Sequence, residues 1–380
     1  MAVAKQNLKT VTPLERELIE ALAVRYAEGK QAAELTMEFG AICSSVPTSD
    51  KIDPRDLAYA AKMRQVAQKN PTNPDVLTLY AESELLTIPG HFWIAQTDKP
   101  IGRAGEIADR LEAMLAAHPS HIGLNHYMTH VVDVNAVAQR AVPAAERLAS
   151  LAPASPHLQH MSTHIFMRVG RYSDAIQANV AALAAEDKLD VQLRHQGFEP
   201  VKNWRPHNSQ FLMISALMAG RGDIALDIAR TISRRAEGAQ SSMGEFSRSQ
   251  PLLVLLRLER YKDLLRETRP AGQRGVASIL YLYSRGVALA KTHDLAGATA
   301  ALAEMRPQVI DALTSHASEN FPDRMVRAIV QVAQDALSAE VAAQSGEKNK
   351  AIEFAKNAAK IGEPLNDLDP PMLAADPRLA

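Results

Sequence analysis

The sequence of 380 residues has a single cysteine, Cys43, and only 5% aromatic residues. One cysteine cannot build a disulfide framework or a multi-cysteine metal site, so we interpret Cys43 as a lone structural thiol. The shortage of aromatic residues argues against a β-sandwich. An excess of one charge is also missing. The 42 Lys and Arg stand against 43 Asp and Glu, which excludes nucleic-acid binding driven by bulk basicity.

Long apolar segments are absent as well. No run approaches the roughly 18–20 residues that a membrane span needs, and residues 1–17 contain no apolar stretch typical of an export signal. Phosphate-binding loops, dinucleotide-binding glycines, nucleophile elbows and HExxH zinc motifs are not found either. We therefore expect a soluble, cytoplasmic protein without membrane or nucleic-acid partners.

What the sequence does contain is helical periodicity. Leu14, Leu18 and Leu22 fall on one helical face, and Thr12-Pro13 supplies an N-cap and a first-turn proline before them. Residues 89–100 have turn residues at both ends and no period, which indicates an ordered loop. Runs of β-branched residues are rare and hairpin signals are missing. The sequence therefore predicts an all-α fold.

Four turn segments repeat one pattern, in which a tight turn and polar residues precede the Ala-containing start of a second helix. They centre on Gly170, Gly220, His293 and Gly346. The pattern is typical of the turn inside a tetratricopeptide unit. The spacings, counted between Asp174, Asp223, Asp294 and Glu347, are 49, 71 and 53 residues. Because these exceed the roughly 34-residue repeat, we expect a tetratricopeptide-like α-solenoid of antiparallel helix pairs that contains insertions or an unrecognised hairpin.

We expect three segments along this array. Residues 1–100 form an N-terminal helical segment with the ordered loop, and residues 101–235 form histidine-rich repeats. Residues 236–380 form C-terminal repeats and a tail. One insertion is expected at residues 189–204.

Histidines are concentrated in the middle segment. Ten of the twelve lie between positions 91 and 207. His126 and His130 are four residues apart, so on a helix they share one face and can bind one ion. His160 and His164 repeat this spacing, and each lies 34 residues after its counterpart. One repeat length places the two pairs on neighbouring first helices, which line the concave surface of such arrays. We expect four imidazoles in a square patch, and further ligands are expected at His207, His157 and His121.

A cluster of imidazoles without thiolates suits copper, iron, zinc or nickel more than magnesium or calcium. Copper is our first expectation, and iron or zinc follow. Asp133 and Arg168 lie near these histidines in sequence, where Asp133 could orient a ligand. We also interpret Asp133, Arg168 and Glu199 as candidate catalytic residues. The competing interpretation is that the histidines are core residues that bind nothing.

The same stretches resemble a family of bacterial tetratricopeptide-repeat proteins. Residues 118–133, 157–172 and 206–208 are similar to segments that read HPGANHYYIHAVE, HLVHMPSHIYMRVGRY and YPHN in that family. The likeness covers roughly residues 12–235. It implies the repeat fold. Eight residues of this chain match positions of the family motifs: His118, His126, His130, His157, His160, His164, His207 and Asn208.

This sequence departs from the family pattern in two places. Asp133 stands where the family has glutamate, so its carboxylate reaches less far. Many members also have a longer N-terminal part with a CxxCxWG motif, which this sequence lacks.

Several functions fit these features. The first is a metal-dependent enzyme with a mono- or dinuclear site in the concave groove, which oxidises a small organic substrate with O2. Its histidine content is similar to that of dinuclear copper centres, which is an analogy only. A zinc or iron hydrolase with Asp133 or Glu199 as base is the sibling interpretation. The alternatives are a scaffold that binds a peptide or protein partner, and metal storage or sensing without turnover.

Overall fold

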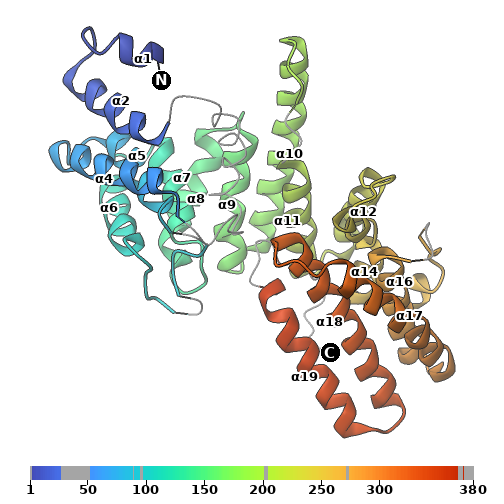
Figure 1. Ribbon diagram of the computed structural model, residues 1–380. Helices are drawn as coiled ribbons and strands as arrows, with labels where there is room; N and C mark the ends of the chain where they lie inside the picture. Colours follow the sequence, from blue (N-terminus) through green and yellow to red (C-terminus); the bar gives the residue numbers. More distant parts are fainter. Residues whose placement is uncertain are drawn as a thin grey trace. The chain divides into compact units, whose positions relative to one another are not determined.

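The computed structural model (Figure 1) describes residues 2–26, 52–88, 90–94, 97–200, 204–270, 274–366 and 371. Within these ranges the chain is α-helical and has no β-strand, and one isolated bridge pairs Trp93 with Pro100. The predicted all-α class is confirmed. None of the helices in these ranges has the length and apolar character required to cross a bilayer. Cys43 lies outside the described residues, so its interpretation stays a prediction.

The chain divides into two compact units, Met1–Val201 and Lys202–Ala380. The expected boundary at 235 falls inside the second unit, and the three expected segments stay a prediction. The helices of the first unit are α1 (Ala2–Gln6), α2 (Pro13–Arg25), α4 (Pro54–Lys69), α5 (Pro74–Leu85), α6 (Ala104–Ala117), α7 (Ile122–Val131), the 3-10 helix η2 (Ala138–Ala141), α8 (Val142–Leu151), α9 (Pro156–Arg168) and α10 (Tyr172–His195).

The helices of the second unit are α11 (Trp204–Met218), α12 (Gly222–Arg235), α13 (Ser242–Arg248), α14 (Gln250–Arg257), α15 (Tyr261–Leu264), α16 (Val276–Lys291), α17 (Leu295–Ser315), α18 (Phe321–Gln344) and α19 (Lys348–Asn366). Residues 189–204, expected to be an insertion, instead begin in the last turns of α10 and end at the start of α11, and residues 201–203 lie outside the described ranges.

Helices pack in order along each unit. In the first, α8 packs on α9 and α9 on α10, while α5 also contacts α7 and α7 contacts α9. In the second, α16 packs on α17, α17 on α18 and α18 on α19, while α16 also contacts α18. Contacts between successive helices, together with contacts between alternate ones, are the arrangement of a tetratricopeptide-like α-solenoid. Each unit has its own core of buried apolar side chains, which include Leu124 and Ile165 in the first and Ile279 and Val330 in the second.

The turns inside the helix pairs share one hydrogen-bond geometry. Gly170, Gly220 and Gly346 have φ angles of 77°, 71° and 77°, and each following amide donates to a carbonyl five residues earlier. This is the Schellman motif that ends a helix. His293 (φ 67°) and Glu259 (φ 55°) occupy the same position without being glycine. The turn at Glu259 lies inside the 71-residue interval between turns, so it supplies the hairpin that the spacing required.

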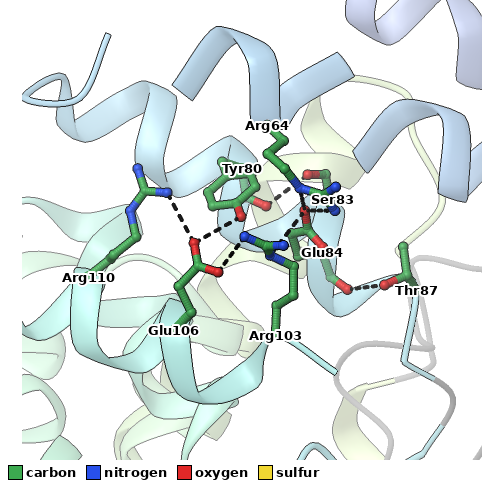
Figure 2. Close-up of polar contacts among 8 residues, drawn as sticks. All are labelled: Arg64, Tyr80, Ser83, Glu84, Thr87, Arg103, Glu106 and Arg110. Carbon is green, nitrogen blue, oxygen red and sulfur yellow. Dashed lines mark hydrogen bonds and ion pairs between the residues drawn. The ribbon is translucent and has the colours of Figure 1, made fainter. Parts of the chain in front are cut away.

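A charged network connects α4, α5 and α6 (Figure 2). Glu84 is only 3% exposed and accepts hydrogen bonds from Nε and Nη2 of Arg64 at 2.9 and 2.6 Å. Arg103 lies 4.0 Å from the same carboxylate and pairs with Glu106 at 2.5 Å, and Arg110 is 3.6 Å from Glu106. Each of these three arginines therefore lies near one of two carboxylates of the same unit, Glu84 or Glu106.

The turn geometry yields a matched pair of stability predictions. A Cβ at Gly220 would meet nothing within 4 Å, so Gly220→Ala tests backbone strain alone and should lower the free energy of unfolding by about 1 kcal/mol. His293→Gly relieves the same strain and should raise the free energy of unfolding. The gain should be at most about 1 kcal/mol, because the added freedom of glycine in the unfolded chain offsets part of it. Urea unfolding of both variants checks the signs, and equal destabilisation by both would contradict this account.

Candidate metal centre

Two neighbouring helices of the first unit, α7 and α9, carry five histidines. The helix α9 starts at Pro156, and the hydroxyl of Ser155 before it accepts a hydrogen bond from the Leu158 amide. His157 consequently lies in the first turn of α9. Both pairs with four-residue spacing are helical as expected, and the 34-residue offset places them on helices that contact each other.

His126, His130 and His157 form one cluster, which we call the three-histidine cluster. The Nε2 atom of His126 lies 3.0 Å from Nε2 of His157 and 3.0 Å from Nε2 of His130. All three rings offer a nitrogen within 4.8 Å of the others. The expected square of four imidazoles is therefore replaced by a triangle, because the first turn of α9 brings His157 against the α7 pair.

The convergence of three Nε2 atoms requires a positive charge among them or an imperfect set of hydrogen bonds. One Nε2 proton satisfies one N–H···N contact, whereas the Nε2 atom of His126 has two such neighbours. A cation accepts all three lone pairs at once. The 3.0 Å separations are short enough for the two nitrogens of each contact to bind one ion at metal–nitrogen distances of about 2.0–2.1 Å.

Burial keeps His126 and His130 neutral. Burial lowers the pKa of His126 to about 4. Burial also lowers the pKa of His130 well below its usual value, and the neighbouring His126, His157 and His164 add to this effect while Asp133 opposes it. A neutral imidazole has a free lone pair, which is the form that binds metal. At neutral pH, His126 and His130 are therefore ready to act as ligands.

His160 and His164 form a second group, the two-histidine pair, with side chains only 1% and 3% exposed. Their Nε2 atoms lie 2.9 Å apart. The Nδ1 atom of His164 lies 2.8 Å from Oδ2 of Asp133, and Nδ1 of His160 lies 2.9 Å from Oδ1 of Asn179. Both Nδ1 atoms face acceptors, so each ring is fixed in orientation with Nε2 directed toward its partner.

Asp133 and Arg168 support the pair instead of forming a free acid or base. Oδ1 of Asp133 accepts a hydrogen bond from Nε of Arg168 at 3.0 Å, and Oδ2 faces His164. Both carboxylate oxygens are thus engaged. These contacts agree with the ligand-orienting interaction that the sequence suggested for Asp133. The interpretation of Asp133 and Arg168 as catalytic residues stays a prediction.

Two other predicted residues lie outside both groups. His121 is the N-cap of α7: its Nδ1 accepts a hydrogen bond from the Leu124 amide at 3.1 Å, and its Nε2 faces Asp75 at 3.0 Å. Both ring nitrogens face partners and His121 belongs to neither histidine group, and its assignment as a ligand stays a prediction. Glu199 is exposed in the segment after α10 and belongs to neither histidine group, and its catalytic role stays a prediction.

The remaining predicted ligand, His207, belongs to the second unit. It lies in the first turn of α11, and its ring centroid is 4.9 Å from that of Phe211. Asn208 follows it and is completely buried. The prediction that His207 is a metal ligand stays a prediction.

Sequence reasoning missed Asn179. This residue lies on α10, is completely buried, and donates its Nδ2 proton to the carbonyl of Ala175 at 3.1 Å. That bond identifies Oδ1 as the atom facing His160. The sequence contained one indication of this role. Asn179 lies in the alanine-rich stretch 175–185, and a buried polar side chain in such a helix needs a hydrogen-bond partner.

The lowered pKa values give a prediction for metal-free protein. Below about pH 6.5 the unfolded chain protonates His126 and His130, whereas native His126 stays neutral until about pH 4. Between these values the unfolded state binds more protons, so stability should fall as the pH falls through this window. Urea unfolding at several pH values measures the slope. His126→Gln should flatten it, His195→Gln at an exposed position is the control, and a slope that is unchanged in both would contradict the burial of His126.

Comparison with known proteins adds little to this geometry. No family model matches the chain, and no curated protein matches it, so the family resemblance stays a prediction. A solved structure titled "Structure of Naa15/Naa10 bound to HypK-THB" contains a similar chain with 12% identity and a TM-score of 0.40. The match covers 91% of this chain and 51% of the chain in that structure. This chain therefore spans about half the length of the chain that it matches. At this TM-score we transfer no property from it.

Proposed function

We propose that this protein is a metal-dependent oxidoreductase that binds a transition metal ion at His126, His130 and His157 and oxidises a small organic substrate with O2. The observation that carries the proposal is the convergence of three Nε2 atoms, with the contacts of His126 at 3.0 Å. The low pKa of His126 and His130 supports it, because both rings are neutral ligands at physiological pH.

Copper is the preferred ion, followed by iron and zinc. A purely imidazole set suits all three, and divalent copper binds most tightly in the general affinity order.

The surroundings favour oxidation over hydrolysis. A general base beside the attacking water assists metal-dependent hydrolysis. Asp133, the carboxylate that faces His164, is engaged by His164 and Arg168, and Glu199 is exposed after α10. Three protein nitrogens leave further coordination positions for O2 or a substrate, and a copper or iron ion supplies the redox chemistry.

The alternative function is a scaffold that binds a peptide or protein partner. Such a scaffold would use unpaired Lys or Arg side chains to bind carboxylates. In the network of Figure 2, Arg64, Arg103 and Arg110 instead face Glu84 and Glu106 of the same unit. This arrangement gives the scaffold less support than the metal site.

Metal content tests the proposal. Protein purified without a histidine tag should retain copper, measured by inductively coupled plasma mass spectrometry after dialysis. His126→Ala/His157→Ala should weaken retention by at least about 100-fold, because two of three ligands are removed, while exposed His195→Gln should leave it unchanged. Oxygen uptake by the copper-loaded protein with a panel of phenols and amines then separates an oxidase from a carrier. Equal metal retention in the wild type and the double variant would contradict the proposed ligands.

A further inference from the structure

We infer that Ser242 and His316 form a second reactive site, in which a serine nucleophile and its histidine base hydrolyse esters of short carboxylic acids. Oγ of Ser242 lies 2.8 Å from Nε2 of His316. Ser242 lies at the start of α13, and His316 follows the last residue of α17. Both residues belong to the unit Lys202–Ala380, so this pair is separate from the three-histidine cluster of the first unit.

The other ring nitrogen of His316 determines the direction of this hydrogen bond. Nδ1 lies 2.9 Å from the carbonyl oxygen of Ala312, four residues earlier on α17. A carbonyl oxygen only accepts, so Nδ1 carries the proton. In the neutral imidazole Nε2 therefore has the lone pair, and the hydroxyl of Ser242 donates to it. This is the direction in which a histidine base takes the proton of a serine nucleophile.

Contacts with two long helices hold both residues of the pair in place. On the histidine side, Arg327 of α18 donates from Nη1 to the carbonyl oxygens of His316 and Ser318 at 2.7 and 2.6 Å. On the serine side, Glu245 of α13 accepts a hydrogen bond from the amide of Ala277 on α16 at 3.1 Å. The reacting atoms are thus anchored to α16 and α18, and a nucleophile and base on rigid elements keep the alignment that the reaction needs.

The surroundings of the pair indicate the class of substrate. Ser242 and His316 are both half-buried, so a small molecule in solution reaches them. Met243 follows the serine, and Leu313 precedes the histidine by one turn. Both are partly buried apolar side chains that pack against the core of the second unit. Apolar neighbours of this kind favour an uncharged substrate with a short apolar acyl group.

The reaction needs only an ester and water. Oγ of Ser242 attacks the carbonyl carbon of the ester, and its proton passes to Nε2 of His316. The bond to the alcohol oxygen breaks, and His316 gives the proton to that oxygen, which leaves an acyl-serine and a free alcohol. Water then attacks the acyl-serine while His316 takes a proton from it. Return of this proton to Oγ regenerates the serine and releases the carboxylic acid.

A serine-reactive fluorophosphonate and p-nitrophenyl acetate test this site on the full chain. The fluorophosphonate should label Ser242, as located by peptide mass spectrometry, and the ester should be hydrolysed. Ser242→Ala should abolish the labelling and the hydrolysis. Ser247→Ala is the matched control, because Ser247 on the same helix donates to the carbonyl of Met243 at 3.0 Å instead of to a histidine. Both rates should be unchanged in this control.

Substitution of His316 separates a base from a structural contact. His316→Gln keeps a hydrogen-bond partner for Ser242 but cannot take its proton. Circular dichroism should therefore show a folded protein, while labelling slows by at least about 100-fold. His293→Asn changes another histidine of the same unit to a residue that tolerates its positive φ, and should have no effect. Equal labelling rates in the wild type and His316→Gln, or no label on Ser242 in the wild type, would overturn the inference.

Discussion

The candidate site of the first unit depends on one constraint: five buried or half-buried imidazoles on α7 and α9 direct Nε2 atoms toward each other within two groups. Contacts of 2.9–3.0 Å between ring nitrogens are unfavourable among neutral rings unless protons or metal ions lie between them. Helices α7 and α9 hold the rings in place, and Asp133 and Asn179 fix the orientation of the buried pair. The same burial that keeps His126 neutral makes these nitrogens available to a metal.

The repeated packing of helix pairs holds the imidazoles in these positions. First helices of neighbouring pairs pack side by side, so side chains of α7 and the first turn of α9, such as His126 and His157, meet without a loop to position them. Trp93, buried in the loop before α6, donates its indole proton to the Val131 carbonyl at 2.5 Å and so fixes the end of α7. A site built on helices holds its geometry more precisely than a site on loops. The repeat scaffold therefore provides a preorganised set of ligands.

Much of this arrangement could be predicted from the sequence, and the remainder depends on tertiary packing. Helical periodicity and the 34-residue offset placed His126, His130, His160 and His164 on adjacent helices. The offset does not specify how α9 crosses α7, so it could not assign His157 to the three-histidine cluster. Asn179 lies on the second helix of its pair, where no spacing rule connects it to His160. The role of His121 as an N-cap was missed because histidine is an uncommon capping residue. The turn at Glu259 lacks the glycine that marks the others.

The central claim is that the Nε2 atoms of His126, His130 and His157 bind one metal ion. X-ray absorption at the copper edge, on protein loaded with one equivalent of copper, tests it most directly. We predict a first shell of nitrogen ligands at about 2.0 Å with the outer-shell scattering of at least three imidazoles. A shell of oxygen donors without imidazole scattering would show that the convergent histidines are not the ligands, and the account would fail.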